Sequence, residues 1–289
     1  MKTNTLALLL LALGLFSSPL SVEARDWTNA DGKTITAELV SATDDAVVLK
    51  MVNGREYTVP LNTLSAADGE FAKSWQAEQV AMAEAPAPKT ETLMTIPGKL
   101  IYGAKFDTID GDWSMAKGDW KSSGEYLTGI ELAADDHGAV MKRSLTLKDA
   151  IIEFDVMLGE TKGTSFSIDN NDHMCRVSIS TAGFQAKKDD NDHEGPDVAK
   201  PFNSVSEELE ADEWYTVRIE LLGEEMLAQI GDDVSLGSDP LIAQDKTKWG
   251  FTVAGDTVKF RDLYVWEALP NEEWEKTGSR LKRKLDIDE

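Results

Sequence analysis

The chain contains a single cysteine, Cys175, among its 289 residues. A lone thiol has no partner for an internal disulfide, so the fold has to be stabilised by burial of apolar side chains. Histidine is also scarce: only His137, His173 and His193 occur, and their spacing carries no zinc signature. We therefore predict no metal centre built on cysteine or histidine.

Basic residues are few relative to acidic ones. The chain has 29 Lys and Arg against 52 Asp and Glu, which gives a net charge of −23. A charge this negative disfavours nucleic acid and anionic membrane surfaces as partners. It suits an aqueous exported compartment and leaves glycans and proteins as the partner classes.

Long apolar runs are absent beyond the start of the chain. The longest run, from Leu6 to Phe16, has about eleven residues, whereas a membrane-spanning helix needs roughly 20. Lys2 precedes this run, and small residues at Val22 and Ala24 follow it in the positions that a signal peptidase reads. The sequence therefore predicts a signal peptide over residues 1–24, no membrane insertion and a periplasmic or secreted location.

Residues 25–75 have the pattern of a small β module. Apolar residues alternate over 33–40 and 46–52, and Asp31-Gly32 and Asn53-Gly54 lie between apolar runs, as hairpin turns do. The stretch 64–75 is typical of a short helix that Ser65 caps. Four or five short strands in about fifty residues predict a small barrel.

The same residues resemble the Sla homology domain, a small SH3-like barrel. The resemblance rests on residues spread over the whole module: Arg25, Trp27, Gly32, Ala37-Glu38, Leu49, Gly54, Val59-Pro60-Leu61, Leu64-Ser65 and Asp68. It implies that residues 25–75 bind a protein or a short peptide. The alternative is that Trp27, Val59 and Leu61 are core residues, not ligand contacts.

The composition changes twice after residue 75. Residues 76–97 are rich in Ala, Glu, Pro and Thr, which predicts the end of a helix followed by a flexible linker. Residues 269–289 are a charged tail with a short helix. Between these segments, residues 98–268 hold ten strand-like runs and almost no helical periodicity, which predicts an antiparallel β-sandwich. The runs cover 99–106, 125–130, 150–158, 164–168, 173–180, 183–188, 214–222, 225–230, 249–254 and 258–268.

This large module resembles the concanavalin-like jelly rolls, in particular the 3-keto-disaccharide hydrolase domains of exported bacterial proteins. The motifs that carry the resemblance include EFDV at 153–156, HMCRV at 173–177, WYTVRIEL at 214–221 and KWGFTVAG at 248–255. The resemblance implies a mainly β fold: a small SH3-like barrel followed by a concanavalin-like β-sandwich. It also implies a glycan as ligand or substrate, because this sandwich carries both hydrolases and non-catalytic lectin-like domains.

The stretch 173–180 contains Cys175 beside Arg176. Alternate residues of a strand share a face, so Cys175, Val177 and Ile179 form an apolar side that belongs in the core. A buried cysteine is not a nucleophile. Arg176 lies on the opposite side, where it either binds a sugar or carboxylate or pairs with one of the many acids.

Glycoside hydrolases usually catalyse with a pair of carboxyl groups. Glu153 and Asp155 share one face of a strand, but Met157 occupies the next position on that face, where laminarinase-type enzymes have a further acid. A laminarinase-type site is therefore incomplete. Glu153 and Asp155 are either ligand contacts or the polar side of an amphipathic strand.

The loop over residues 187–197 is the most polar part of the module. Its acids resemble a calcium loop, but an EF-hand needs a bidentate glutamate where this chain has Pro201, so only an irregular Ca²⁺ site stays open and no other cofactor is predicted. We take His193, Asp197 and Lys200 as candidate ligand contacts near this loop. Trp249, with Trp113 and Trp120, follows a polar stretch and is a candidate for an exposed sugar-stacking ring.

Three functions are consistent with these patterns. The first is an exported two-module binding protein, with a glycan or cell-envelope component on the sandwich and a protein on the barrel. The second is a glycoside hydrolase or lyase acting on 3-keto sugars through His173, Arg176, His193 and Asp197, in which a base and a cation suffice. The third is a structural envelope protein without a ligand.

Overall fold

A computed structural model describes residues 24–84, 86–192 and 194–287. The chain divides into two compact units after Glu84, and each is described here by itself. No helix in the described ranges is long and apolar enough to cross a membrane. The predicted signal peptide lies outside the described residues apart from Ala24, and so does His193.

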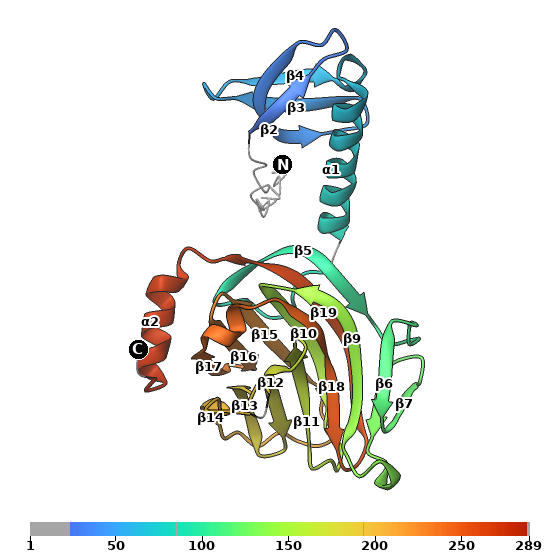
Figure 1. The fold of residues 1–289 in the computed structure, drawn as a ribbon, viewed down its shortest axis with the longest axis vertical. Helices are drawn as coiled ribbons and strands as arrows, with labels where there is room; N and C mark the ends of the chain where they lie inside the picture. Colours follow the sequence, from blue (N-terminus) through green and yellow to red (C-terminus); the bar gives the residue numbers. More distant parts are fainter. Residues whose placement is uncertain (1–23, 85, 193, 288–289) are drawn as a thin grey trace, which may run out of the picture. The chain divides into compact units, whose positions relative to one another are not determined.

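The N-terminal unit is a four-stranded antiparallel sheet with one long helix (Figure 1). The strands pair in sequence order, so β1 and β4 are the edges of the sheet. The elements are β1 (Arg25–Thr28), β2 (Thr34–Ala42), β3 (Ala46–Met51), β4 (Glu56–Pro60), η1 (Leu61–Thr63) and α1 (Ala66–Glu84). The helix α1 continues past residue 75 into the stretch where the sequence predicts the end of a helix. The assignment of residues 25–75 to a Sla homology module stays a prediction.

The core of the N-terminal unit forms around Trp27. This side chain is 1% exposed and its Nε1–H donates to the Ala37 carbonyl at 3.1 Å, which confirms that Trp27 is a core residue. Ser65 caps α1 as predicted, because its Oγ accepts from the Asp68 backbone N–H. The Asp68 carboxylate in turn accepts from Arg25 and from the Thr28 backbone N–H, both at 2.8 Å, and so ties the start of β1 to the start of the helix.

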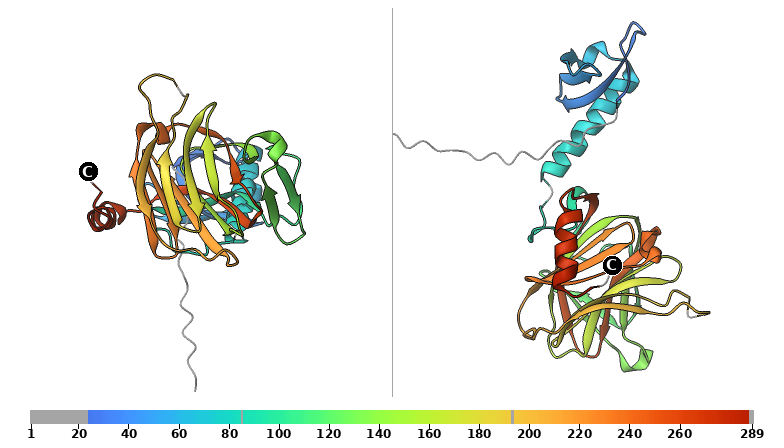
Figure 2. Two further views of the ribbon diagram at one scale, coloured as in Figure 1. Left: turned by 90° about the horizontal axis from the view of Figure 1, so that it is seen from below. Right: turned by 90° about the vertical axis from the view of Figure 1, so that its left-hand side faces the viewer.

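The C-terminal unit is a sandwich of two antiparallel sheets (Figures 1 and 2). The eight-stranded sheet has the order β17-β16-β15-β10-β19-β8-β7, and β5 also pairs with β19. Its strands are β5 (Thr95–Ala104), β7 (Asp119–Ser122), β8 (Leu127–Ile130), β10 (Ala150–Met157), β15 (Tyr215–Leu222), β16 (Glu225–Ile230), β17 (Asp233–Ser238) and β19 (Val258–Pro270).

The seven-stranded sheet has the order β14-β13-β12-β11-β18-β9-β6. Its strands are β6 (Trp113–Lys117), β9 (Ala139–Leu147), β11 (Gly163–Asp169), β12 (His173–Ser180), β13 (Gly183–Lys188), β14 (Lys200–Val205) and β18 (Lys246–Ala254). The remaining elements are η2 (Ala133–Asp135), η3 (Pro240–Ala243) and α2 (Trp274–Lys284). All strand pairs are antiparallel, which confirms the predicted mainly β sandwich.

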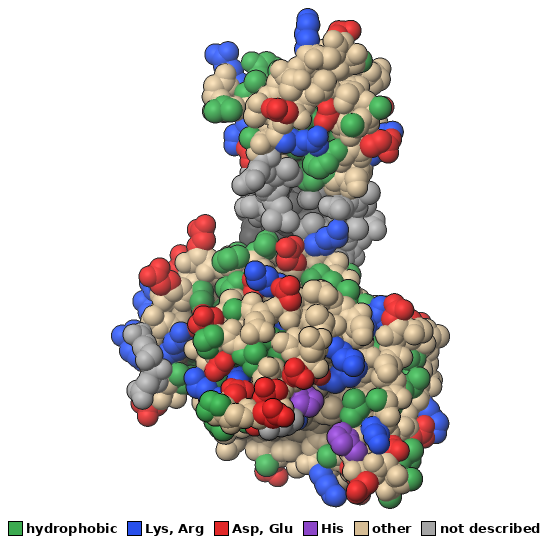
Figure 3. Space-filling view, viewed as in Figure 1, with side chains coloured by type: hydrophobic (Ala, Val, Ile, Leu, Met, Phe, Trp, Pro, Cys, Tyr) green, Lys and Arg blue, Asp and Glu red, His purple; other side chains and the backbone are tan. Residues whose placement is uncertain are grey.

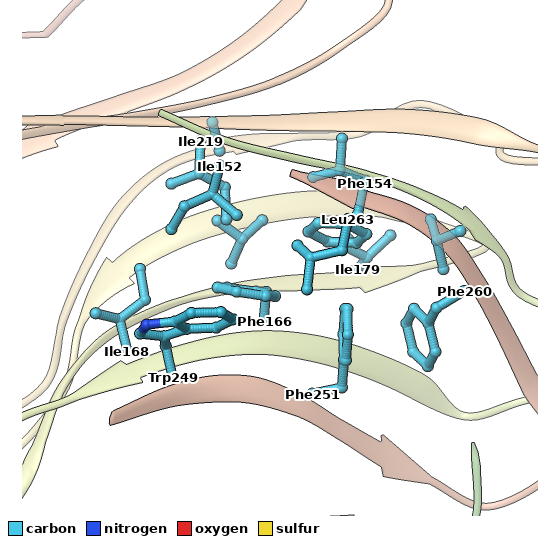
Figure 4. Close-up of a cluster of buried hydrophobic side chains, with 14 of the residues drawn as sticks. Ile152, Phe154, Phe166, Ile168, Ile179, Ile219, Trp249, Phe251, Phe260 and Leu263 are labelled. Carbon is cyan, nitrogen blue, oxygen red and sulfur yellow. The ribbon is translucent and has the colours of Figure 1, made fainter. Parts of the chain in front are cut away.

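The main core lies between the two sheets and is rich in aromatic rings (Figure 4). Phe251 of the seven-stranded sheet stacks on Phe260 of the eight-stranded sheet with 4.1 Å between ring centroids. Phe154 reaches the same cluster from β10 and lies 5.2 Å from Phe166. Each fully buried ring of this kind contributes about 1.5–3 kcal/mol, so burial alone accounts for a stable sandwich without a disulfide.

The outer face of the eight-stranded sheet is covered by two segments from the ends of the unit. One is the stretch 86–95, which we call the strap. The other is α2, whose Trp274 packs with Met94, Leu227 and Leu236 in a second cluster. The sequence predicts the end of a helix and then a flexible linker over 76–97; α1 ends at Glu84, and the strap that follows is hydrogen-bonded to the sheet. The strap is ordered because its backbone N–H groups donate to the buried carboxylates of Glu153 and Glu220.

Candidate functional site

The outer face of the seven-stranded sheet carries no covering segment comparable to the strap among the described residues, and it is polar. Strand register places five small uncharged side chains in one line across five neighbouring strands. In spatial order they are Ser204, Gln185, Ser178, Ser165 and Thr252, and we call them the polar row. Because neighbouring strands lie about 4.8 Å apart, the row is roughly 19 Å long.

The polar row forms the floor of an open groove with a volume of about 560 Å³. Its members are partly bonded to one another: the hydroxyl oxygens of Ser165 and Ser178 are 3.3 Å apart, and the Gln185 amide donates to Ser204. Hydroxyl and amide groups each both donate and accept hydrogen bonds. The floor therefore offers donors and acceptors at every strand.

The charge of the groove differs from that of the chain. Among the described residues that line it, Lys162 and Arg176 carry a fixed positive charge, and none is Asp or Glu. The whole chain has 52 acids and 29 bases, so a lining without carboxylates is unusual for this sequence. On the face of the molecule drawn in Figure 3, basic and acidic side chains of the described residues lie among one another, and hydrophobic ones occur singly or in small groups.

Arg176 extends into the groove from β12, and a buried carboxylate fixes the position of its guanidinium. Its Nε donates to Asp189 at 2.7 Å, and Lys187 contacts the other oxygen of the same carboxylate at 3.2 Å. Asp189 is 3% exposed, so this support is rigid. Within the described residues, the two terminal nitrogens of Arg176 have no hydrogen-bond partner. The end of the guanidinium is free to bind a ligand.

A second charged group lies beside Arg176 on the same face. The Lys142 ammonium donates to the hydroxyl of Ser167, to the Ser167 carbonyl at 3.3 Å and to Asp169 at 2.8 Å. Burial is the largest cause that lowers the pKa of Lys142, and Arg176 adds to it. His173, whose Nδ1 is 3.3 Å from Asp169, completes the group. All three donors of the ammonium are used, so we read this group as structural.

The three described members of the predicted catalytic set make separate contacts. Arg176 binds Asp189, His173 contacts Asp169, and Asp197 pairs with the buried Lys188, so each of the three has a different partner. His193 lies outside the described residues. Lys200 donates to the Ser238 carbonyl at 3.1 Å across the edge of the sandwich. Of the candidates, only Arg176 is among the described residues that line the groove.

Glu153 and Asp155 lie on the other sheet, under the strap. Glu153 accepts from the Lys89 backbone N–H at 2.7 Å and from the Thr90 hydroxyl at 3.1 Å. Asp155 accepts from the Lys89 ammonium at 2.7 Å and from Arg261 at 3.0 Å. Both carboxylates are buried, and their bonds are made within the chain.

The expectation that Trp249 is exposed is wrong. The ring is fully buried in the aromatic core, and its Nε1–H donates to the Leu145 carbonyl at 3.1 Å. Trp113 and Trp120 are also buried, at 5% and 6% exposed. Trp249 lies inside because Lys248 and Gly250 take the outer positions of β18. Within the described residues, the groove therefore has no exposed tryptophan for sugar stacking.

Cys175 is buried in the core, as predicted. Burial raises the pKa of its thiol to about 12, so the reactive thiolate is absent near neutral pH. Within the described ranges, no group of three or more His, Cys, Asp or Glu side chains is arranged to hold a metal ion. The candidate site is thus an uncharged floor with cations at its margins.

Comparison with known proteins gives matches at the level of fold only. No family model matches the chain, and no curated protein matches it. Among solved structures, the laminarinase from Rhodothermus marinus has a TM-score of 0.48 at 10% identity, covering 60% of this chain and 99% of the other. The carbohydrate-binding module CBM66 from Bacillus subtilis has a TM-score of 0.45 at 14% identity, covering 54% and 96%.

The beta-glucanase from Bacillus licheniformis has a TM-score of 0.44 at 8% identity, covering 59% of this chain and 98% of the other. Likenesses this distant leave the ligand and the activity of this chain undetermined, and both have to be argued from its own residues.

Proposed function

We propose that this protein is an exported two-module binding protein whose sandwich holds a glycan in the groove without cleaving it. The observation that carries the proposal is the lining of the groove: hydroxyl and amide side chains across five strands, with no carboxylate among the described lining residues. A sugar presents hydroxyl groups that both donate and accept, and Ser, Thr and Gln side chains match them in both roles.

The same lining argues against hydrolysis in the groove. Glycoside hydrolysis uses two carboxyl groups, one on each side of the bond that breaks. Asp169 and Asp189 are the buried acids of this sheet, and both are engaged by cations. A binding role needs no free acid. Since the described lining has no stacking tryptophan, the affinity comes from hydrogen bonds, and we expect it to be modest.

Retention on polysaccharides tests the proposal. The mature full chain would be run through gels that contain single soluble polysaccharides, neutral and acidic, and any released sugars would be followed by mass spectrometry. We expect retention by at least one polysaccharide without release of sugar. The double variant S165A/S178A removes two adjacent hydroxyls from the polar row and should weaken retention about tenfold, since each lost hydrogen bond is worth about 0.5–1.5 kcal/mol.

Ser144→Ala is the matched control, because Ser144 is an exposed residue of the same sheet that is not among those lining the groove. Absence of retention on every polysaccharide would contradict the glycan-binding function. Release of sugars that depends on Arg176 would show an enzyme instead.

We also propose that the N-terminal unit binds a protein. The support is an open sheet edge at β4 together with apolar side chains on the surface: Ile35 is 40%, Tyr57 48% and Val52 87% exposed. An array of short peptides probed with the full chain tests this. Tyr57→Ser should abolish the bound spots, whereas Val198→Ser, which changes an exposed residue of the other unit, should leave them unchanged.

A further inference from the structure

We infer that the groove selects an acidic glycan, with a sugar carboxylate or sulfate bound by the free end of the Arg176 guanidinium. This inference rests on the proposed glycan-binding function and names the chemical class of its ligand. It comes from the charges of the lining, where Lys162 and Arg176 stand without any carboxylate among the described residues.

The geometry of Arg176 suits a planar or trigonal anion. A guanidinium binds carboxylate and sulfate groups through two parallel N–H donors, and its own support should not use those donors. The Arg176 Nε–H donates to Asp189, so this bond does not use the two terminal nitrogens of the guanidinium. Within the described chain those two nitrogens have no hydrogen-bond partner. A buried carboxylate that orients an arginine in this way pre-organises it for a ligand.

The local charge balance also favours an anion. Asp189 neutralises one of its two cationic partners, Arg176 and Lys187, so this triad keeps a net charge of +1. At physiological ionic strength charges are screened beyond about 8 Å, so the net charge of −23 on the whole chain acts weakly at this point. The nearest fixed charges determine which ligand is bound.

Lys162 provides a second cation at the other end of the groove. It directly precedes β11, whereas Arg176 pairs with Ser167 of that strand. Five residues along a strand separate Lys162 from Ser167, which corresponds to about 16 Å. The hydroxyls of Ser165 and Ser178 lie between these two points. A short acidic oligosaccharide that lies along the strand direction, and so crosses the polar row at Ser165 and Ser178, therefore meets a cation at each end of this span.

The test compares ligands that differ only in charge. Polygalacturonate is paired with its fully methyl-esterified form, and a sulfated galactan is paired with its desulfated form, so that the two arms separate carboxylate from sulfate. Poly-L-glutamate serves as a polyanion without sugar. The full chain is titrated with each at physiological salt, as wild type and as Arg176→Gln, Arg176→Lys and Arg280→Gln. Arg280 is an exposed arginine of α2, so its variant removes the same charge elsewhere.

We expect the wild type to bind one acidic glycan at least tenfold more tightly than its uncharged counterpart. Arg176→Gln should remove most of this preference, so that the charged and uncharged forms bind about equally. Arg176→Lys should keep part of it, and Arg280→Gln should keep all of it. Thermal melting of each variant checks that the sandwich stays folded.

Three results would overturn the inference. Equal binding of charged and uncharged forms leaves the glycan-binding function intact and removes the acidic preference. Binding of poly-L-glutamate as tight as that of the acidic glycan shows that the protein is attracted to any polyanion. Equal losses in Arg176→Gln and Arg280→Gln show an effect of net charge alone. If no glycan of any kind binds, the proposed function itself fails.

Discussion

Cys175 and Arg176 are consecutive residues of β12, yet their side chains leave the seven-stranded sheet on opposite sides. The thiol is 0% exposed in the core, and the guanidinium lines the groove. The alternation of a β-strand thus separates the one cysteine of the chain from the polar surface beside it. Chemistry that needs a thiol and an arginine together is excluded at this position.

The burial of Cys175 predicts an inert thiol. Ellman's reagent at pH 8 should leave the native protein unlabelled and should react with one thiol per chain in denaturant, because burial raises the thiol pKa to about 12. Cys175→Ser should cost about 1–3 kcal/mol of unfolding free energy, since it buries a hydroxyl in an apolar site. Cys175→Ala keeps the site apolar and should cost less. Rapid labelling of the native protein would show that the site opens.

Glu220 is predicted to be the most sensitive point under the strap. Its carboxylate accepts from the backbone N–H groups of Leu93, Met94 and Thr95 at 2.7–2.9 Å, and Arg218 Nε lies 3.1 Å from it. Glu220→Gln should lower the unfolding free energy by about 3–5 kcal/mol, because it removes the carboxylate that pairs directly with the buried Arg218. Urea unfolding measures this. Glu267→Gln changes an exposed acid of β19 and should cost almost nothing; similar losses in both would contradict the assignment.

The strap also predicts where a truncated sandwich can begin. A chain that starts at residue 86 keeps all the hydrogen bonds of the strap, whereas a chain that starts at residue 98 leaves Glu153, Asp155 and Glu220 without these partners. Loss of several hydrogen bonds to buried carboxylates is strongly destabilising, although Asp155 keeps Arg261 and Glu220 keeps Arg218. We expect cooperative thermal unfolding for 86–289 and aggregation or a much lower midpoint for 98–289. Equal midpoints would show that the strap is dispensable.

Lys246 predicts a rise of stability with pH. The residue is 0% exposed, its Nζ donates to the Lys148 carbonyl at 2.5 Å, and burial is the largest cause that lowers its pKa below 10.5. Between the folded pKa and the unfolded pKa the unfolded chain holds the extra proton, so the unfolding free energy increases with pH in that window. Lys246→Met should be more stable than the wild type at neutral pH.

This advantage of Lys246→Met should shrink as the pH approaches about 10, where the wild-type lysine loses its proton in both states. Urea unfolding of wild type and Lys246→Met between pH 7 and pH 10 measures the difference between their unfolding free energies. The contributions of the other titratable groups cancel in this difference. Lys276→Met is the control, because it changes an exposed lysine of α2 that is not among the groups shifting the pKa of Lys246. A difference that is constant with pH would contradict the lowered pKa.

Gly250 is predicted to tolerate no side chain. A Cβ at this position would lie 2.2 Å from the Met141 carbonyl oxygen, and its φ of +155° is one that other residues rarely adopt. Gly250→Ala should therefore push β18 from β9 and lower the melting temperature by several degrees. Gly111→Ala has nothing within 4 Å of the new Cβ and serves as control. An unchanged melting temperature for Gly250→Ala would contradict this account.

The fold was largely predictable from the sequence because most strands carry an apolar alternation. The ten strand-like runs of the large module all correspond to strands of the sandwich. The strands that were missed are β6, β7, β9, β14 and β17. Lys142 and Arg143 interrupt the apolar pattern of β9, Pro201 occupies the second position of β14, and β17 contains Gly237. Their pairing partners, not their own residues, hold these segments in the sheets.

The candidate site was less predictable. The alternation of β12 correctly separates Arg176 from the core, but the polar row depends on which strands become neighbours. Ser165, Thr252 and Gln185 are far apart in the sequence and meet through pairing alone. The strap is foreshadowed in the sequence by Arg218 and Glu220, two charged residues in an otherwise apolar strand. Buried charges in such a strand require partners from another segment.

The strap and α2, which begin and end the C-terminal unit, both pack on the outer face of the eight-stranded sheet, and neither covers the seven-stranded sheet. This arrangement has a practical consequence for handling the protein. A tag, a dye or a surface tether joined to the C-terminus follows α2, which packs on the sheet that does not contain the groove. Immobilisation through that end therefore attaches the sandwich at the sheet that does not carry the polar row.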